Sequence, residues 1–255
     1  MNETTMEHHA NANTAGHTRP LAGRHVMVVG GTSGIGLAVA RDVASAGAEV
    51  TLVGRDPQRL RRAAGSIGGA RQLVGDLHDA SVFEALFDAL PPLDHLVITA
   101  GTASLKTLRE STPDDWRRVA EERIVGPLAI VRAALNRLRQ DGSIVLTSGL
   151  LASRPMHTGA VIGAGVAAVE AMVRALSLEL APIRVNAVSP GLVDTPLLDT
   201  FFGDGKHEAL ASAAAALPTG RIGRPDDIAQ AVRLLLTGGF ITGEVLHLDG
   251  GARWA

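Results

Sequence analysis

The stretch HVMVVGGTSGIGLAVA at residues 25–40 decides the fold, because an apolar run leads through glycines into apolar residues at helical spacing. Gly30, Gly34 and Gly36 fall where this strand would turn into a helix. Glycines let a backbone turn sharply and approach a pyrophosphate, whose charge then lies at the helix N-terminus. A tight turn without a ligand is the alternative that the motif alone leaves open. The strand before it and the helix after it favour a nucleotide site.

Short β-branched runs alternate with longer helical patterns along the rest of the chain. We expect strands at 25–30, 49–54, 72–75, 93–101, 143–149, 183–191 and 244–251, and helices at 35–47, 79–90, 114–138 and 164–180. The strand runs lack clean alternation, as in parallel strands that are buried on both faces. Repeated strand–helix units make a doubly wound parallel sheet with right-handed crossovers. We predict a three-layer α/β/α Rossmann-type fold in one domain over residues 21–255, after a disordered tail at 1–20.

Composition and charge exclude several classes of protein. The 255 residues are 46% hydrophobic and 20% charged, and the net charge of −2 gives no reason to expect nucleic acid or an anionic membrane as partner. The chain has no Cys, so it forms no disulfide or thiolate metal site, and we expect no metal. No run is expected to approach the roughly 20 apolar residues of a membrane helix. The polar first 19 residues lack the apolar centre of a signal peptide, so a cytoplasmic protein is expected.

The end of the second strand, at Gly54 and Arg55, indicates which dinucleotide the site prefers. NAD sites place a carboxylate there for the ribose 2′-hydroxyl, whereas NADP sites need space and a cation for the 2′-phosphate. Gly54 takes the position of the acid, and the planar guanidinium of Arg55 suits a phosphate. We predict NADP(H) rather than NAD(H); a solvated Arg55 is the alternative, and Asp56 would reverse the preference if the alignment shifted by two residues. Four further residues could help to hold the phosphate: Thr32, Ser33, Arg59 and Arg62.

Over residues 21–253 the chain resembles the short-chain dehydrogenase/reductase family. Its Gly-x-x-x-Gly-x-Gly spacing is that of the family, although Val29 stands where Thr is frequent. The turn after the fourth strand resembles the family's Asn-Asn-Ala-Gly, with Ile98 and Thr99 in place of both Asn. Segment 184–196 resembles the one that closes over the nicotinamide. The resemblance implies these cofactor ligands: Gly30, Thr32, Ser33, Gly34, Ile35, Gly36, Arg55, Asp76, Leu77, Ala100, Gly101, Pro190, Gly191, Val193 and Thr195.

The family's Asn–Ser–Tyr–Lys catalytic set is missing where the resemblance places it. Arg123 stands at the Asn position, Gly149 at the Ser position, Ile162 at the Tyr position and Val166 at the Lys position. The chain contains no Tyr, and neither of its two lysines lies in the stretch 144–170. A positioned general acid–base contributes about 10²–10⁴-fold. Hydride transfer would therefore be slowed rather than abolished, provided that another group handles the proton.

Five side chains near the site in this fold could take over part of that chemistry: Ser148, His157, Thr158, Arg123 and Thr99. His157 is the one whose ordinary pKa lies near neutrality, and a partly exposed loop histidine is the alternative interpretation. Arg123 could anchor an anionic group of the substrate or cofactor, or could pair with Glu121 or Glu122. His157, Ser148 and Arg123 are our catalytic candidates.

Three functions remain open from the sequence. The family resemblance favours an NADP(H)-linked oxidoreductase acting on a small carbonyl, alcohol or imine through a non-standard proton donor, in a homo-oligomer (dimer or tetramer). The alternatives are a catalytically silent subunit, paired with an active paralogue through the apolar helix 164–180, and a lyase or isomerase without hydride transfer. Segment 197–220, with Phe201 and Phe202, is expected to form a lid over the substrate pocket.

Overall fold

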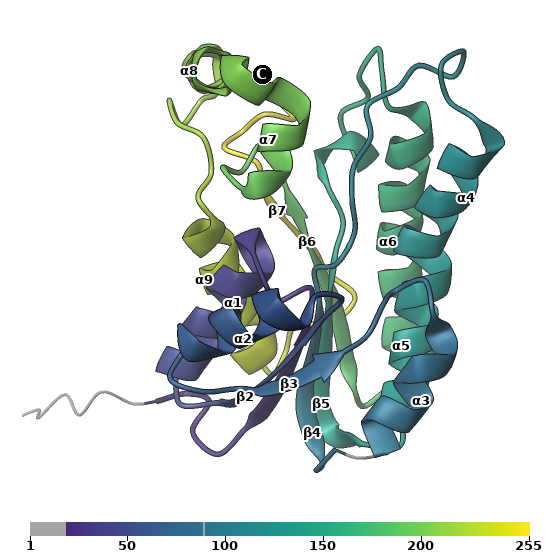
Figure 1. The fold of residues 1–255 in the computed structure, drawn as a ribbon, viewed down its shortest axis with the longest axis vertical. Coiled ribbons are helices and arrows are strands. Elements are labelled where there is room, and N and C mark those ends of the chain that lie inside the picture. Colours follow the sequence, from purple (N-terminus) through teal and green to yellow (C-terminus); the bar gives the residue numbers. More distant parts are fainter. Residues whose placement is uncertain (1–18, 89) are drawn as a thin grey trace, which may run out of the picture.

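The structure is a computed structural model that describes residues 19–88 and 90–255 (Figure 1). Within these residues, seven parallel strands form one sheet in the order β3-β2-β1-β4-β5-β6-β7. The strands are β1 (His25–Val29), β2 (Glu49–Gly54), β3 (Arg71–Val74), β4 (Leu93–Ile98), β5 (Leu138–Thr147), β6 (Arg184–Pro190) and β7 (Val245–Leu248). The chain order reverses between β1 and β4, and ligands of such sheets bind beyond the carboxyl ends of the strands at this point. The predicted Rossmann-type doubly wound fold is confirmed.

Helices cover both faces of the sheet and complete the three layers (Figure 1). The first face carries α1 (Gly34–Ser45), α2 (Pro57–Gly65) and α9 (Pro225–Thr237). The second carries α3 (Ala80–Asp88), α5 (Gly126–Ala134) and α6 (Ala160–Glu179), with α4 (Pro113–Ala120) packed on α6. On β1, Val28 belongs to the apolar core of the first face and Met27 to that of the second. Burial on both faces explains why the strand sequences are continuously apolar.

The single helix predicted over 114–138 is wrong. The segment consists of α4, a π-helical turn η1 (Glu121–Val125) and α5, which ends at Ala134. Pro127 has no amide hydrogen, and its ring crowds the carbonyl one turn earlier, so a regular α-helix cannot run through this point. A π-turn absorbs such a break and is frequent at functional sites. Strand β5 also starts earlier than predicted, because Leu138 already pairs with Leu93 across an irregularity in the ladder.

Helix α6 corrects the expectation that no segment is apolar and long enough to cross a membrane. The helix has 20 residues, and an 18-residue window within it has a mean hydropathy of 1.7, which satisfies that test by length and composition. Its Val, Ile, Leu and Met residues raise the mean hydropathy, and its six Ala residues keep it high. Val169, Val173 and Leu176 lie in the apolar core with β5 and β6. A third of that window is buried, so packing against the sheet accounts for one face of the helix.

The segment predicted as a lid forms α7 (Pro196–Phe202), a 3-10 turn η3 (Gly203–Gly205) and α8 (Lys206–Ala216). These elements project beyond the carboxyl ends of β6 and β7 (Figure 1). The Nζ atom of Lys206 lies 2.8 Å from Oδ1 of Asp194 and 2.7 Å from Oδ1 of Asp199, which ties the start of α8 to the chain after β6. Residues 1–18 of the predicted tail lie outside the described residues.

Candidate cofactor and active site

The loop between β1 and α1 is shaped by backbone contacts that only glycine allows. A Cβ atom on Gly30 would lie 2.7 Å from the Ala100 nitrogen, and one on Gly36 would lie 2.3 Å from the Gly30 oxygen. Gly30 also adopts a φ of 88°, a conformation that side chains disfavour. Ser33 caps α1 without a side-chain hydrogen bond, so the first amides of the helix keep their donors for an anion. These features fit the pyrophosphate of a dinucleotide.

A pocket of about 110 Å³ opens beside this loop, at the carboxyl ends of β1, β2, β3 and β4. It brings together six of the predicted cofactor ligands: Gly30, Arg55, Asp76, Leu77, Ala100 and Gly101. Three further polar residues that sequence reasoning missed also line it: His78, Thr102 and Glu122. They directly follow or precede residues that were singled out, but no motif marks them.

The polar wall of this pocket is a chain of hydrogen bonds around two carboxylates. Oδ1 of Asp76 accepts from the backbone N–H of His78 at 3.1 Å and lies 2.8 Å from its Nδ1. Partial burial raises the pKa of Asp76, but the bonds from His78 and the charge of Arg55 outweigh it and leave that pKa below its ordinary value. Glu122 accepts from the Thr102 amide at 2.6 Å and from its hydroxyl. An ionised Asp76 is suited to accept from an exocyclic amine.

The end of β2 leaves no room for a carboxylate side chain at the position of Gly54. A Cβ atom there would lie 2.8 Å from Cγ2 of Thr32, so a side chain would require that residue to move. Asp56, the alternative acid, caps α2 by accepting from the amides of Gln58 at 2.7 Å and Arg59 at 3.2 Å. These two backbone bonds lower the pKa of Asp56. The Asp56 carboxylate is therefore occupied by the first amides of α2.

A second hollow of about 390 Å³ lies next to the glycine loop and is strongly basic. It contains the predicted phosphate helpers Thr32, Ser33, Arg59 and Arg62, together with Arg41, which sequence reasoning missed. Arg41 could have been found, because it follows Ser33 and Leu37 at successive intervals of four residues on one face of α1.

The segment after β6 lies against both the last strand and the glycine loop. A Cβ atom on Gly191 would lie 2.7 Å from the Asp249 Cα, and one on Gly34 would lie 3.3 Å from the side chain of Thr195. Pro190 ends β6, and Val193 forms a bridge with Gly223. The fold thus brings Thr195 beside the phosphate loop, as the predicted cofactor set requires.

The positions to which the family resemblance assigns Ser, Tyr and Lys form an apolar wall. Ile162 and Val166 are buried on α6, and a Cβ atom on Gly149 would lie 3.6 Å from Cγ1 of Val166. Leu105 and Ile162 both approach Gly159, the residue before α6. No side chain at positions 149, 162 and 166 can exchange a proton.

Arg123 is a buried charged residue beside this wall, because its stem packs on Gly165, the residue before Val166. It is 8% exposed and sits on the π-turn, where Nη2 donates to the Thr102 carbonyl at 2.6 Å. Its Nε is buried without a hydrogen-bond partner among the described residues. Burial lowers the pKa of Arg123, and the charge of Glu122 opposes that shift. On α6, Gly165 leaves space for the Arg123 stem, since a Cβ there would lie 3.1 Å from Cγ.

The other two catalytic candidates are placed differently. The Ser148 hydroxyl lies 3.1 Å from the Val166 carbonyl and 2.9 Å from Oε1 of Glu170, so it is held by α6. His157 is exposed in the loop before α6 and makes no polar contact within residues 19–88 and 90–255. Thr99 donates its hydroxyl to the Val29 carbonyl at 3.1 Å. The structure therefore brings Arg123 to the wall and leaves His157 without a partner that would orient it.

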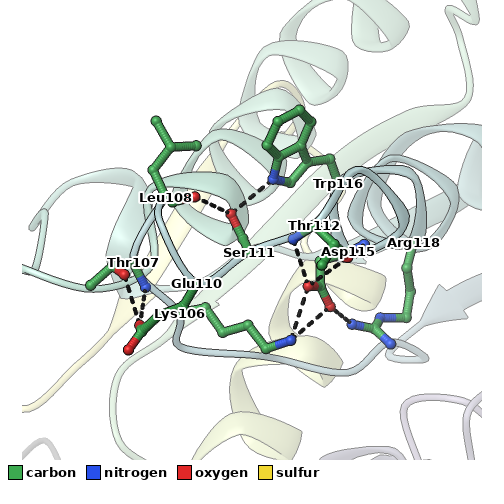
Figure 2. Close-up of polar contacts among 9 residues, drawn as sticks. All are labelled: Lys106, Thr107, Leu108, Glu110, Ser111, Thr112, Asp115, Trp116 and Arg118. Atoms are coloured by element: carbon green, nitrogen blue, oxygen red, sulfur yellow. Dashed lines mark hydrogen bonds and ion pairs between the residues drawn. The ribbon is translucent and has the colours of Figure 1, made fainter.

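The loop after β4 is fixed by ion pairs and hydrogen bonds (Figure 2). Nζ of Lys106 lies 2.9 Å from Oδ2 of Asp115, which also accepts from the Thr112 amide at 2.9 Å and pairs with Arg118. The Thr112 amide and the Lys106 ammonium together lower the pKa of Asp115. The Lys106 carbonyl in turn accepts from the Gly159 amide at 3.0 Å. This network joins α4 to the turn that begins α6.

In the described part of the chain, no three His, Asp or Glu side chains are grouped so that they could hold a metal ion. The residues that meet at the switch point fit a dinucleotide, so the fold and site define a nucleotide-binding α/β protein of the doubly wound class.

Comparison with known proteins specifies the family. A family model described as enoyl-(acyl carrier protein) reductase matches residues 29–253. The short-chain dehydrogenase/reductase ATR9 of Stachybotrys chlorohalonatus is 36% identical over 253 residues, covering 91% of this chain and 98% of the relative. The NADP-dependent (R)-specific alcohol dehydrogenase of Lentilactobacillus kefiri is 32% identical, covering 92% and 98%. The chain belongs to the short-chain dehydrogenase/reductase family.

A solved structure adds a likeness in three dimensions. It is the NADPH-bound short chain oxidoreductase from Pseudomonas aeruginosa PAO1, described as containing an atypical catalytic center. Its TM-score is 0.85 at 32% identity, and the match covers 91% of this chain and 97% of the other.

Proposed function

We propose that this protein is an NADP(H)-dependent oxidoreductase for a small carbonyl, alcohol or imine, in which Arg123 replaces the electrostatic part of the missing catalytic set. The observation that carries the proposal is the glycine-built phosphate loop with the arginine-lined hollow beside it. The names of two relatives, one NADP-dependent and one NADPH-bound, support the same cofactor.

Preference for the 2′-phosphate rests on charge and space at the end of β2. Thr32 crowds Gly54, and Asp56 is used as a helix cap, so neither position offers a carboxylate to a ribose hydroxyl. Arg55, Arg41, Arg59 and Arg62 lie around the two hollows that meet this loop. Arginine forks bind phosphate oxygens in pairs, and several such cations favour the additional charge of NADP(H) over NAD(H).

NADPH, held by the glycine loop and the arginines beside it, would supply the hydride for the carbonyl or imine carbon. The heteroatom then gains negative charge and needs a proton. At positions 149, 162 and 166 this chain offers apolar surface, which lowers the local dielectric and strengthens nearby electrostatic interactions. Arg123 supplies a fixed positive charge beside this surface, and preorganised charge of this kind stabilises an anionic transition state. The guanidinium remains protonated, so the proton comes from solvent.

A titration of the full-length protein with NADPH and NADH, followed by calorimetry or fluorescence, tests the cofactor site. Steady-state loss of NADPH absorbance over a panel of carbonyls and imines then tests the reaction. Tighter binding of NADPH than of NADH, together with turnover, is the expected result. Failure to bind either cofactor would contradict the whole proposal.

The apolar wall also favours a second candidate, a catalytically silent subunit. It predicts NADPH binding without turnover on any carbonyl or imine, and co-purification with an active relative. The oxidoreductase instead predicts a homo-oligomer in the cytoplasm. Large apolar side chains on α4, α5 and α6 support an oligomer because they are exposed: Trp116, Leu128 and Leu178. Light scattering of the purified protein gives its mass, and a monomer would contradict this part of the proposal.

A further inference from the structure

A larger pocket lies on the other side of the molecule, at the amino ends of the strands. Its volume is about 580 Å³, and it lies between β4, β5 and β6, the segment at Pro20 and Leu21, and the C-terminal end of α9. Since the cofactor site occupies the carboxyl ends of the same parallel strands, the two sites are separated by the length of the sheet. Pockets of this volume hold small organic molecules.

Arg184 contributes a positive charge to this pocket that no carboxylate balances. Its Nη1 donates to the Leu235 carbonyl at 2.7 Å and to the Ile241 carbonyl at 3.2 Å, and its Nη2 donates to the Leu236 carbonyl at 2.7 Å, so it is anchored on the end of α9. Its Nε makes no hydrogen bond, and the residue makes no ion pair, within residues 19–88 and 90–255. Burial lowers the pKa of Arg184.

The remaining charges at this edge compensate one another. Arg24 pairs with Asp94 at 2.6 Å and with Asp141 at 3.1 Å, and Arg139 lies 3.5 Å from Asp94. Two cations therefore face two carboxylates. Arg184 is left as the unbalanced charge, and the pocket favours an anion.

His95 supplies an uncharged polar group beside it. The side chain is 5% exposed, and its Nδ1 lies 2.8 Å from the Ser143 hydroxyl. Burial lowers the pKa of His95 to about 4. The charge of Asp94 raises this pKa, whereas the charges of Arg184 and Arg24 lower it further. At neutral pH the ring is therefore neutral. When Ser143 donates to Nδ1, Nε2 carries a hydrogen, and no described residue accepts it.

We propose that this pocket binds a small organic anion, whose carboxylate or phosphate group lies between Arg184 and His95. Leu21, Pro182 and Leu236 line the same pocket and offer apolar contacts to the rest of the molecule. This site is independent of the proposed hydride transfer, because none of its residues belongs to the cofactor site.

Benzoate and phenyl phosphate are suitable probes, with benzyl alcohol as the neutral counterpart. The signals of the His95 ring are followed by NMR in the full-length protein. We expect either anion to shift these signals in a saturable way and to raise the pKa of His95 from about 4, because a bound anion stabilises the protonated ring. The anion that binds more tightly shows whether the pocket prefers a carboxylate or a phosphate. Benzyl alcohol should not shift the His95 signals.

Arg184→Gln could prevent folding, since Arg184 joins β6 to α9. Gln140→Glu avoids that problem because Gln140 is exposed and lines the pocket. The added carboxylate should weaken binding of both anions about tenfold. Gln230→Glu makes the same charge change on the exposed face of α9, outside the pocket, and should bind like the native protein. The absence of a saturable His95 shift with both anions, or equal affinities of the two variants, would overturn the proposal.

Discussion

The guanidinium of Arg123 packs against the backbone of Gly101, with Nη1 2.9 Å and Cζ 3.0 Å from the position that a Cβ atom on Gly101 would take. Gly101 also adopts a φ of 144°, which side chains disfavour. The glycine at the end of β4 and the arginine on the π-turn are therefore matched: the buried guanidinium needs a residue without a side chain. This contact connects the cofactor pocket with the position of the missing asparagine.

Replacing Arg123 should lower turnover more than cofactor affinity. We expect Arg123→Ala to reduce kcat/KM by about 10²-fold, the effect of losing one preorganised charge at a reacting oxygen, while the Kd for NADPH changes little. Steady-state kinetics and a parallel NADPH titration separate the two quantities. Arg123→Lys keeps the charge without the planar fork and should retain part of the activity. Equal activity of Arg123→Ala and the native protein would contradict the role given to this residue.

Gly101→Ala should reproduce part of this loss without altering Arg123 itself. The new methyl group would displace the guanidinium and would also strain the backbone, at a cost of about 1–3 kcal/mol in the free energy of unfolding. Denaturant unfolding measures that cost, and kinetics measure the activity. Gly65→Ala is the matched control, because a Cβ on Gly65 meets no atom within 4 Å. A Gly101→Ala variant with native stability and activity would show that the contact is not needed.

The arginines beside the glycine loop should distinguish NADPH from NADH. Arg59→Ala combined with Arg62→Ala should weaken NADPH about tenfold or more, because charge-assisted hydrogen bonds to phosphate are lost, and should leave NADH unchanged. Calorimetric titration with each cofactor gives both values. Arg61 is exposed on the same helix but does not line the hollow, so Arg61→Ala should bind both cofactors normally. A parallel loss of NADH affinity in the double variant would speak against a 2′-phosphate site.

The Lys106–Asp115 pair should make the free energy of unfolding depend on pH in the acid range. Because the pKa of Asp115 is lowered in the folded chain, its contribution is present above the ordinary pKa of 3.8 and is lost as the pH falls toward the folded value. Asp115→Asn should therefore lower the free energy of unfolding at neutral pH and flatten its decline in acid. Denaturant unfolding at several pH values tests this. Asp114→Asn is the control, since Asp114 is highly exposed and pairs with Arg117; a similar loss in both variants would contradict the expectation.

His157 should contribute little to turnover. An exposed side chain without a polar partner has nothing to orient it, and substitutions of this kind usually change free energies by less than about 0.5 kcal/mol. We expect His157→Gln to keep kcat within about twofold and to preserve the pH dependence of the rate. Loss of an ionisation near neutral pH in this variant would instead restore His157 as the proton donor.

Local patterns account for what could be predicted of the fold. The apolar run before Gly30, the glycine spacing and the β-branched segments depend on neighbouring residues, and they located all seven strands of the described chain to within five residues at either end. The absence of Tyr and of a nearby Lys was also a property of the sequence. The break at the π-turn was missed, because Pro127 is tolerated at the start of a helix and only its packing shows where α5 begins.

The character of the candidate site depends on contacts between distant segments. Ser148 was a catalytic candidate, but its hydroxyl is held by α6; Asp56 was the alternative acid for the ribose hydroxyl, but it caps α2. Arg123 became the central residue because Gly101 and Gly165, far apart in the chain, both leave space for it. The sequence by itself determined the strand–helix order and the phosphate loop, since both are encoded in short-range spacing. Only the tertiary structure decided which polar groups are buried, paired or free, because burial depends on which segments pack together.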